Sequence, residues 1–176
     1  MNKTKRLYVI TGPIGAGKST LLPIIIDRFS IDYTEYVSRD VYFDNEFNYL
    51  GDDYPLRDKL AKQKALRVLH EYMDAEKNIV WETVAAMEDR ITLLKEFKQS
   101  GYYISVFFVS VSNVAVCQER VRVRQQTKGY DIPGAKVAKR YNDSYIYLEK
   151  LKELVNELWI VENSSSINEI EFKKAK

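Results

Sequence analysis

The sequence has almost none of the residues from which covalent or metal-based scaffolds are built. Its 176 residues include one cysteine, Cys117, and one histidine, His70. A lone cysteine excludes an internal disulfide framework and a cysteine zinc site, and a lone histidine excludes a site built on several histidines. The simplest interpretation of the low cysteine content is a reducing cytoplasm. His70 falls within a predicted helix, where we expect a surface position rather than a catalytic one.

The chain also lacks an excess of charge and a long apolar run. It carries 27 basic and 25 acidic residues, a balance that argues against a general nucleic-acid binder or a membrane-surface protein. No apolar stretch approaches the roughly 20 residues that span a bilayer. The stretch after Lys3, Lys5 and Arg6 is short and ends at glycine, so we expect a first strand there and no export signal. The length suits a single domain over residues 1–176.

Glycine is scarce, but three of the seven glycines fall in one short segment. Residues 12–19 read G-P-I-G-A-G-K-S and match the phosphate-loop spacing G-x-x-x-x-G-K-[ST] at every required position. An apolar, β-prone run at 7–11 precedes this segment, and an apolar helical pattern at 19–29 follows it. A glycine-rich turn with a chance lysine, the alternative interpretation, would not need a strand before it and a helix after it. The predicted nucleotide-binding residues are Gly12, Pro13, Ile14, Gly15, Ala16, Gly17, Lys18, Ser19 and Thr20.

The residue types in this loop define its chemistry. Glycines allow successive backbone N–H groups to turn towards phosphate oxygens, and the positive end of the next helix adds to the field. Lys18 is expected to reach the β- and γ-phosphates, and the hydroxyl of Ser19 to ligate Mg²⁺. The sequence therefore predicts ATP and Mg²⁺ as cofactors.

Strand and helix patterns alternate along the rest of the chain, which predicts an α/β fold of the P-loop NTPase type. This alternation favours a parallel sheet of about five strands with helices on both faces. Residues 40–55, which are rich in aromatics and acids, look like a loop, and 167–176 look like a frayed basic tail. The strands are predicted at 7–11, 33–38, 78–83, 102–111 and 159–163, and the helices at 19–29, 57–76, 88–99, 112–126 and 135–158.

Two acids follow predicted strands and are expected at the same sheet edge as the glycine loop. Asp40 comes after the second strand, where a carboxylate can accept the proton of an acceptor hydroxyl. Glu82 ends the third strand beside Thr83, where an acid can orient a Mg²⁺-bound water or the substrate. The competing interpretations are a capping aspartate for Asp40 and a surface acid for Glu82.

A basic helix supplies candidates for a cationic clamp. Arg120 and Arg124 lie four residues apart and therefore on one helix face, whereas Arg122 points elsewhere. Two guanidinium groups near the γ-phosphate would neutralise charge that develops during transfer. The alternative is a solvated basic face, the commonest role of such a run. Arg140 is a third, weaker candidate on the substrate side.

These motifs together resemble the zeta-toxin-like ATPase and kinase family, and in particular its compact branch. The resemblance runs from Leu7 to about Asn163 and implies a P-loop kinase fold with an arginine lid at about 120–140 and an acceptor-side insertion at about 40–76. It also implies phosphorylation of UDP-N-acetylglucosamine and control by an antitoxin protein. In addition to the glycine loop, it rests on Trp81-Glu82-Thr83, Arg120-Val121-x-x-Arg124, Gly129-Tyr130-Asp131-Ile132-Pro133 and Lys139-Arg140-Tyr141-x-x-Ser144.

By this resemblance, Lys18 and Ser19 bind phosphate and Mg²⁺, and Asp40 is the base. Glu82 and Thr83 face the substrate, and the lid carries Arg120 and Arg124. The leading hypothesis is thus an ATP-dependent kinase acting on a hydroxyl of a small molecule such as a UDP-amino sugar.

Two alternatives stay open. The first is a polynucleotide 5′-hydroxyl kinase, although the acids of 40–55 would repel a phosphate backbone. The second is a nucleotide-binding toxin–antitoxin or regulatory ATPase with little transfer activity.

Overall fold

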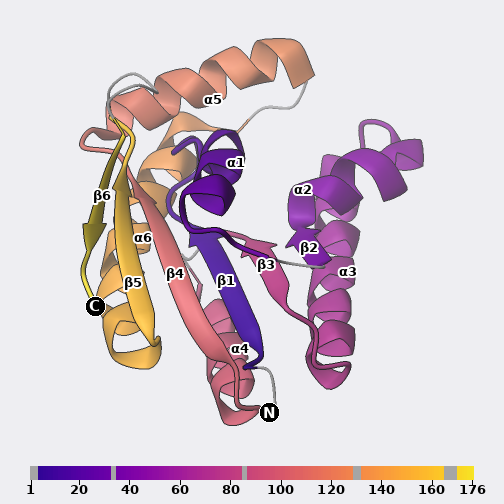
Figure 1. Ribbon diagram of the computed structural model, residues 1–176. Coiled ribbons are helices and arrows are strands. Elements are labelled where there is room, and N and C mark those ends of the chain that lie inside the picture. The colour runs from indigo at the N-terminus through magenta and orange to yellow at the C-terminus, as the bar shows by residue number, and fades with distance from the viewer. Residues whose placement is uncertain (1–3, 33–34, 85–86, 129–131, 165–169) are drawn as a thin grey trace.

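Strand β1 occupies the middle of a six-stranded sheet whose order is β2-β3-β1-β4-β5-β6 (Figure 1). The computed structural model describes residues 4–32, 35–84, 87–128, 132–164 and 170–176. The first five strands are parallel, and β6 pairs antiparallel with β5 at the edge. Parallel pairing places the ends of β1, β2 and β3 at one edge. The strands are β1 (Arg6–Thr11), β2 (Glu35–Ser38), β3 (Ile79–Glu82), β4 (Tyr103–Ser110), β5 (Glu157–Glu162) and β6 (Glu171–Lys174).

Helices cover both faces of this sheet, as the alternating pattern predicted. Strand residues that alternate along the chain point to opposite faces, and each face buries its own apolar cluster. One cluster includes residues of α1 and α5, and the other includes residues of α3, α4 and α6. The main helices are α1 (Lys18–Arg28), α3 (Tyr54–Asp74), α4 (Glu88–Gln99), α5 (Val114–Lys128) and α6 (Gly134–Leu154).

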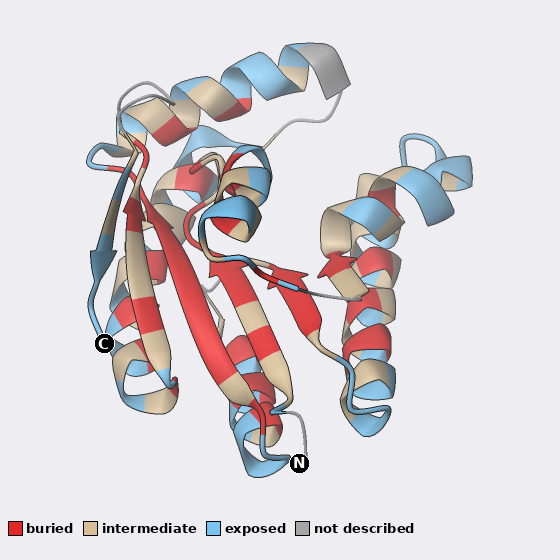
Figure 2. Ribbon diagram, viewed as in Figure 1, coloured by how far each residue is buried: buried red, intermediate tan, exposed pale blue. Residues whose placement is uncertain are grey.

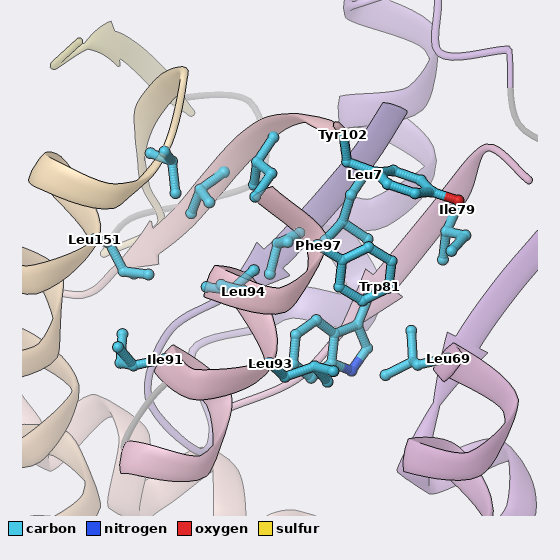
Figure 3. Packing of buried hydrophobic residues seen from close by; sticks show 14 of the residues in the cluster. Leu7, Leu69, Ile79, Trp81, Ile91, Leu93, Leu94, Phe97, Tyr102 and Leu151 are labelled. Atoms are coloured by element: carbon cyan, nitrogen blue, oxygen red, sulfur yellow. The ribbon is translucent and has the colours of Figure 1, made fainter. Parts of the chain in front are cut away.

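The larger cluster surrounds Trp81 of β3. Figure 3 shows its indole ring between Leu93 of α4 and Leu69 of α3, with Phe97 and Tyr102 above. Trp159 of β5 belongs to the opposite face, where its ring is 4.8 Å from that of Phe29. The central strands are buried along most of their length, whereas β6 is exposed at the edge (Figure 2). The sheet is thus packed on both sides.

The segment expected to be a loop at 40–55 is instead mostly helical. It contains α2 (Arg39–Val41), a π-helical turn (Tyr42–Glu46) and a 3₁₀ turn (Asn48–Leu50) before α3 begins. The side chain of Asp53 accepts a bond from the N–H of Leu56 and caps α3. The polar composition of the segment suggested a loop, but local caps and the burial of Phe43 to 1% exposure order it as short helical turns.

The C-terminal region differs from the sequence prediction in two places. The helix expected over 135–158 ends at Leu154, because Val155 is extended and Asn156 exchanges backbone and side-chain bonds with Ile104. The tail expected over 167–176 forms β6 at its described end, and the ring of Phe172 lies 5.7 Å from that of Phe29. The charged residues of β6 suggested a frayed tail, and the contact of Phe172 with Phe29 could not be predicted from them.

The remaining elements lie within a few residues of their predicted positions. Helix α5 continues to Lys128, into the region predicted to be a loop, while residues 129–131 of that loop lie outside the described part of the chain. Residues 33–34 of the predicted second strand are also outside it. His70 is half-exposed on α3 and contacts Glu96 across the helix pair, as a surface position would. Among the described helices, none combines the length and apolar character that crossing a membrane requires.

Candidate functional site

The glycine loop lies between β1 and α1, at the carboxyl edge of the sheet. Gly12, Gly15 and Gly17 all have positive φ angles, of 137°, 78° and 91°. A Cβ atom on Gly12 would lie 2.3 Å from the carbonyl oxygen of Val109, and one on Gly15 would lie 2.6 Å from that of Cys117. These positions therefore require glycine for both conformation and space.

Lys18 is the first residue of α1 and lies within the concave side of this loop. Its side chain is buried, and its Nζ donates hydrogen bonds to the carbonyl oxygens of Gly12, at 3.2 Å, and Pro13, at 2.8 Å. Burial lowers the pKa of Lys18, whereas the carboxylates of Glu82 and Asp40 act in the opposite direction. A partly desolvated ammonium group at a helix N-terminus is a strong centre for attracting phosphate oxygens.

Glu82 connects the loop to β3 and β2. Its Oε1 accepts a 2.7 Å hydrogen bond from the hydroxyl of Ser19, and its Oε2 accepts another of 2.7 Å from the hydroxyl of Tyr36. Glu82 is only 6% exposed, and burial together with its negative charge raises the pKa of Tyr36. The tyrosine thus remains a proton donor that orients the carboxylate towards Ser19.

Asp40 lies between two arginines. Its Oδ1 accepts a bond of 2.5 Å from Arg39, and its Oδ2 accepts one of 3.3 Å from Arg124 on α5. Burial alone would raise the pKa of Asp40, but the two guanidinium groups outweigh it and hold the pKa below its ordinary value. Arg39 is itself fixed by Asp58 of α3, which accepts bonds of 2.9 Å and 2.5 Å from it. Asp40 is therefore an ionised carboxylate in a set position.

Arg120 contacts the glycine loop from α5. Its guanidinium donates to the carbonyl oxygens of Ala16, at 3.4 Å, and Asn163, at 3.0 Å. The side chain of Asn163 donates a 2.7 Å bond to the same Ala16 oxygen. Arg120 and Arg124 thus share a helix face, as predicted, but they contact different elements. Arg122 pairs with Glu119 on the exposed side.

The other two predicted residues are Thr83, directly after β3, and Arg140, on α6. Thr83 follows Glu82, and its N–H donates a 3.0 Å bond to the carbonyl oxygen of Ile10 in β1. Arg140 lies on α6, where its carbonyl oxygen accepts a bond from Ser144. The positive charge of Arg140 acts on Arg90 of α4, whose Nε donates a 3.2 Å bond to the hydroxyl of Thr83.

The predicted residues of the loop differ in their surroundings. Pro13 and Ala16 are buried and supply carbonyl acceptors, Ile14 is half-buried, and Thr20 is exposed on the first turn of α1. The structure brings Glu82, Asp40 and Arg124 close enough to Lys18 for all three charges to act on its pKa. It does not place Arg120 in that group.

Sequence reasoning did not single out four polar residues that complete this arrangement, namely Tyr36, Arg39, Arg90 and Asn163. Asn163 follows the last parallel strand, and that position alone could have indicated it. Tyr36 lies within a strand and Arg90 within a charged helix, where no local pattern separates them from surface residues.

A divalent cation fits the donors next to Lys18. Mg²⁺ is usually held by one or two protein oxygens, and phosphates and waters complete its shell. Ser19 and Glu82 supply a hydroxyl and a carboxylate in direct contact. Within the described ranges, no group of three or more His, Cys, Asp or Glu residues forms a metal site of its own. The donor set therefore fits a cation shared with a phosphate ligand.

Comparison with solved structures places this fold among P-loop kinase-like proteins. A chain of the PezAT toxin–antitoxin system of Streptococcus pneumoniae matches with a TM-score of 0.71 at 17% identity, covering 92% of this chain and 69% of that one. The AvrRxo1-ORF1:-ORF2 complex with ATP matches at 0.69 and 11% identity, covering 98% of this chain and 58% of that chain. Shikimate kinase from Acinetobacter baumannii, in complex with shikimate, matches at 0.56 and 16%, with coverages of 93% and 86%.

At these identities the structural similarity establishes the fold, and the family assignment comes from the sequence. A search of curated proteins gave no match. A family model described as an AAA domain matches residues 7–145, which includes the glycine loop, both strand-end acids and the arginine helix. Since this match covers most of the chain, the protein belongs to the AAA domain family and has the P-loop kinase-like form of its α/β fold.

Proposed function

We propose that the protein is a Mg²⁺- and ATP-dependent phosphotransferase that acts on a hydroxyl of a small molecule. One observation supports this proposal above the others. Glu82 from β3 accepts a bond from Ser19, the neighbour of Lys18, and Asp40 after β2 contacts Arg124 of α5. The charges of all three act on the pKa of Lys18. Phosphoryl transfer to a hydroxyl needs three groups near a phosphate-binding lysine: a ligand for the cation, a base and a cationic clamp.

The loop and Lys18 bind the triphosphate in this proposal. Lys18 exchanges its bonds with the Gly12 and Pro13 carbonyls for bonds to phosphate oxygens, and the N-terminus of α1 adds favourable potential. When bound, Mg²⁺ would neutralise charge on the phosphates. Ser19 and Glu82 would hold that ion, and Tyr36 keeps the carboxylate of Glu82 oriented.

Asp40 receives the acceptor hydroxyl. Its carboxylate has about four lone-pair positions, so it can accept a further bond while Arg39 remains attached. A pKa below the ordinary value makes Asp40 a weak base that stays ionised at neutral pH. Such a base suits a loose transition state, in which the hydroxyl loses its proton late. Asp40 therefore orients the hydroxyl and takes its proton as transfer is completed.

The two lid arginines have different tasks in this scheme. Arg124 is 44% exposed at its side chain and contacts Asp40 at 3.3 Å, and in this scheme it turns to the γ-phosphate. Arg120 bonds to Ala16 of the loop, so in this scheme it positions the loop and does not contact the γ-phosphate. The finer proposals are a UDP-amino sugar as acceptor, an antitoxin-like protein as partner and a cytoplasmic location. The first two follow the zeta-toxin-like resemblance, and the PezAT similarity supports the partner.

The test is ADP release from Mg-ATP in the presence of hydroxyl compounds, with UDP-N-acetylglucosamine included. Asp40→Ala should lower acceptor-dependent turnover by roughly 10²- to 10⁴-fold, the usual range for loss of a general base. Arg124→Ala should lower it by about 10²-fold or more because transition-state charge loses a donor. Arg122→Ala, which alters the same helix on its exposed side, is the matched control and should retain activity.

Three outcomes would count against these assignments. Turnover that survives in both Asp40→Ala and Arg124→Ala would remove the proposed base and clamp. Transfer to an oligonucleotide 5′-hydroxyl in preference to every small acceptor would favour a polynucleotide kinase. Retention of ATP without acceptor-dependent turnover, together with a protein that co-purifies stoichiometrically, would favour a regulatory ATPase of the toxin–antitoxin type.

A further inference from the structure

The aromatic ring of Phe43 is buried outside the two apolar clusters that cover the sheet. It is 1% exposed, yet it belongs to neither cluster. The guanidinium carbon of Arg39 lies 4.2 Å from the centre of the ring, and that of Arg57 lies 4.1 Å from it. The ring of Tyr54 is 5.3 Å away. A ring buried against two cations attracts both through its π face and so ties the two arginines together.

Arg57 joins the short turns between β2 and α3, which pack against α3 (Figure 1). Its Nη1 donates a 2.8 Å bond to the carbonyl oxygen of Gly51, where the 3₁₀ turn ends. Its Nη2 donates to the carbonyl oxygen of Phe43, at 3.0 Å, and to the side-chain oxygen of Asn48, at 3.4 Å. Turns this short leave carbonyl groups without a partner inside the turn. Arg57 therefore supplies, from α3, the donors that these turns lack.

The turn that contains Phe43 directly follows the candidate base. Phe43 lies three residues after Asp40, within the π-helical turn Tyr42–Glu46, where the N–H of Phe47 donates a 3.0 Å bond to the carbonyl oxygen of Tyr42. π-helical turns are rare, and they occur frequently at functional sites. The contacts from α3 thus act on the backbone that carries the base.

Arg39 is the link between the buried ring and the base. Two bonds to Asp58, of 2.9 Å and 2.5 Å, and one of 3.2 Å to the hydroxyl of Tyr54 hold the edge of its guanidinium group. The ring of Phe43 lies against its face. The same group donates a 2.5 Å bond to Oδ1 of Asp40. The orientation of the carboxylate therefore follows the plane of Arg39.

From these contacts we propose that Phe43 and Arg57 are positioning residues for Asp40. Arg57 holds the ring of Phe43, the ring holds the plane of Arg39, and Arg39 holds the carboxylate. This proposal rests on the phosphotransferase function above and adds two residues to the same site. Neither residue contacts the reacting atoms. Both affect transfer because a misplacement of about 1 Å can lower a rate roughly 10²-fold.

The mobility of Arg39 tests the first step without any turnover. Exchange of its Nε–Hε proton with water is followed by NMR on the full chain with Mg²⁺ and a non-hydrolysable ATP analogue. Phe43→Leu, and Arg57→Lys, which keeps the charge but loses the planar fork, should speed up this exchange roughly 5- to 30-fold, the factor that corresponds to one desolvated cation–π contact. The controls are Tyr49→Leu and Arg67→Lys, at exposed side chains, which should leave the exchange unchanged.

Turnover tests the second step through double-mutant cycles. With the acceptor found in the screen above, Phe43→Leu and Arg57→Lys should each lower kcat roughly 10- to 100-fold, with the KM for ATP unchanged. In an Asp40→Ala background the same substitutions should change kcat by less than about 2-fold, because residues that act only through Asp40 have nothing left to position. Thermal unfolding shows whether each variant is folded, and Arg57→Lys serves as the second variant if Phe43→Leu is not.

The outcomes separate a positioning role from a purely structural one. Equal losses of kcat in the wild-type and Asp40→Ala backgrounds would show a general structural role and overturn the proposal. Unchanged exchange of the Arg39 proton in folded variants would overturn it as well. Faster exchange in a protein that transfers phosphate to no hydroxyl would support the fixed position of Arg39 beside Asp40 and reject the phosphotransferase instead.

Discussion

At the scale of single residues, the site is a chain of alternating charges that crosses several elements. Asp58 of α3 holds Arg39, Arg39 holds Asp40, and Asp40 contacts Arg124 of α5. Arg39 also lies 4.2 Å above the ring of Phe43, which limits its rotation. Each charge in the series is fixed by a neighbour of opposite sign, so the position of the candidate base depends on an aspartate that does not touch it.

The first prediction concerns that aspartate. Burial alone would raise the pKa of Asp58, but Lys62 and Arg39 outweigh it and leave the pKa below the ordinary 3.8. A carboxyl group of this kind stabilises the fold above its unfolded pKa and loses that contribution as the pH falls through its folded value. Asp58→Asn should therefore lower the free energy of unfolding at pH 7 by about 1–3 kcal/mol, and the difference from wild type should shrink below about pH 4.

Urea unfolding at several pH values measures this difference. Asp52→Asn, a change at an exposed acid of the same region, is the control and should have little effect. A stability loss that does not vary with pH, or that Asp52→Asn reproduces, would contradict the prediction.

The residues of the site differ in how far the sequence could reveal them. Lys18 and Ser19 follow from a motif whose spacing and neighbours are local. Asp40 and Glu82 follow from the rule that parallel strands end at one edge. Tyr36 and Arg90 could not be found in this way, because Tyr36 meets Glu82 across 46 positions and Arg90 bonds to Thr83 from within a charged helix.

At the scale of elements, β6 shows how a short charged strand can carry structure. The four residues of β6 pair with β5, and two of them are lysines. Yet the ring of Phe172 contacts two residues at the end of α1. The guanidinium of Arg28 is 4.6 Å from it, and the ring of Phe29 also lies against it. The strand covers an edge of the sheet that β5 would otherwise expose. The composition suggested a frayed tail because a four-residue strand with three charged residues shows no recognisable alternation of apolar and polar residues.

The second prediction follows from this contact. Phe172→Ala should lower the free energy of unfolding by roughly 1–2.5 kcal/mol, about half the cost of a fully buried phenylalanine. The melting temperature should fall by about 3–8 °C. Thermal unfolding measures both, with Tyr49→Ala, at a ring that is 77% exposed, as the control. If the two variants melt alike, β6 does not contribute as proposed.

At the scale of the whole molecule, the glycine loop is joined to nearly every part of the sheet. Its residues contact Val109 at the end of β4, Cys117 and Arg120 on α5, Asn163 after β5 and Glu82 of β3. These partners are separated from the loop by up to 147 positions in the chain. A ligand that orders the loop should therefore stabilise the fold as a unit.

The third prediction uses this coupling. Mg-ATP at about 100 times its dissociation constant should stabilise the protein by roughly 2.7 kcal/mol and raise the melting temperature by about 5–10 °C. Glu82→Gln should keep most of the shift seen with ATP and EDTA but lose the additional shift from Mg²⁺. Differential scanning fluorimetry measures each case, with Glu71→Gln on the exposed face of α3 as the control. An equal Mg²⁺ effect in Glu82→Gln would exclude Glu82 from cation binding.

The fluorescence of the two tryptophans can report on two different parts of this fold. Trp81 is 3% exposed, directly precedes Glu82 in the chain and belongs to one apolar cluster. Trp159 lies on the opposite face of the sheet, beside Phe29, and its ring is 5.6 Å from the Nζ of Lys174 in β6. Replacing either tryptophan with phenylalanine leaves a single tryptophan, whose emission can be excited selectively. Trp81 would then report on events at the carboxyl edge, and Trp159 on the β6 edge, so that ligand binding and edge opening could be followed separately without an attached dye.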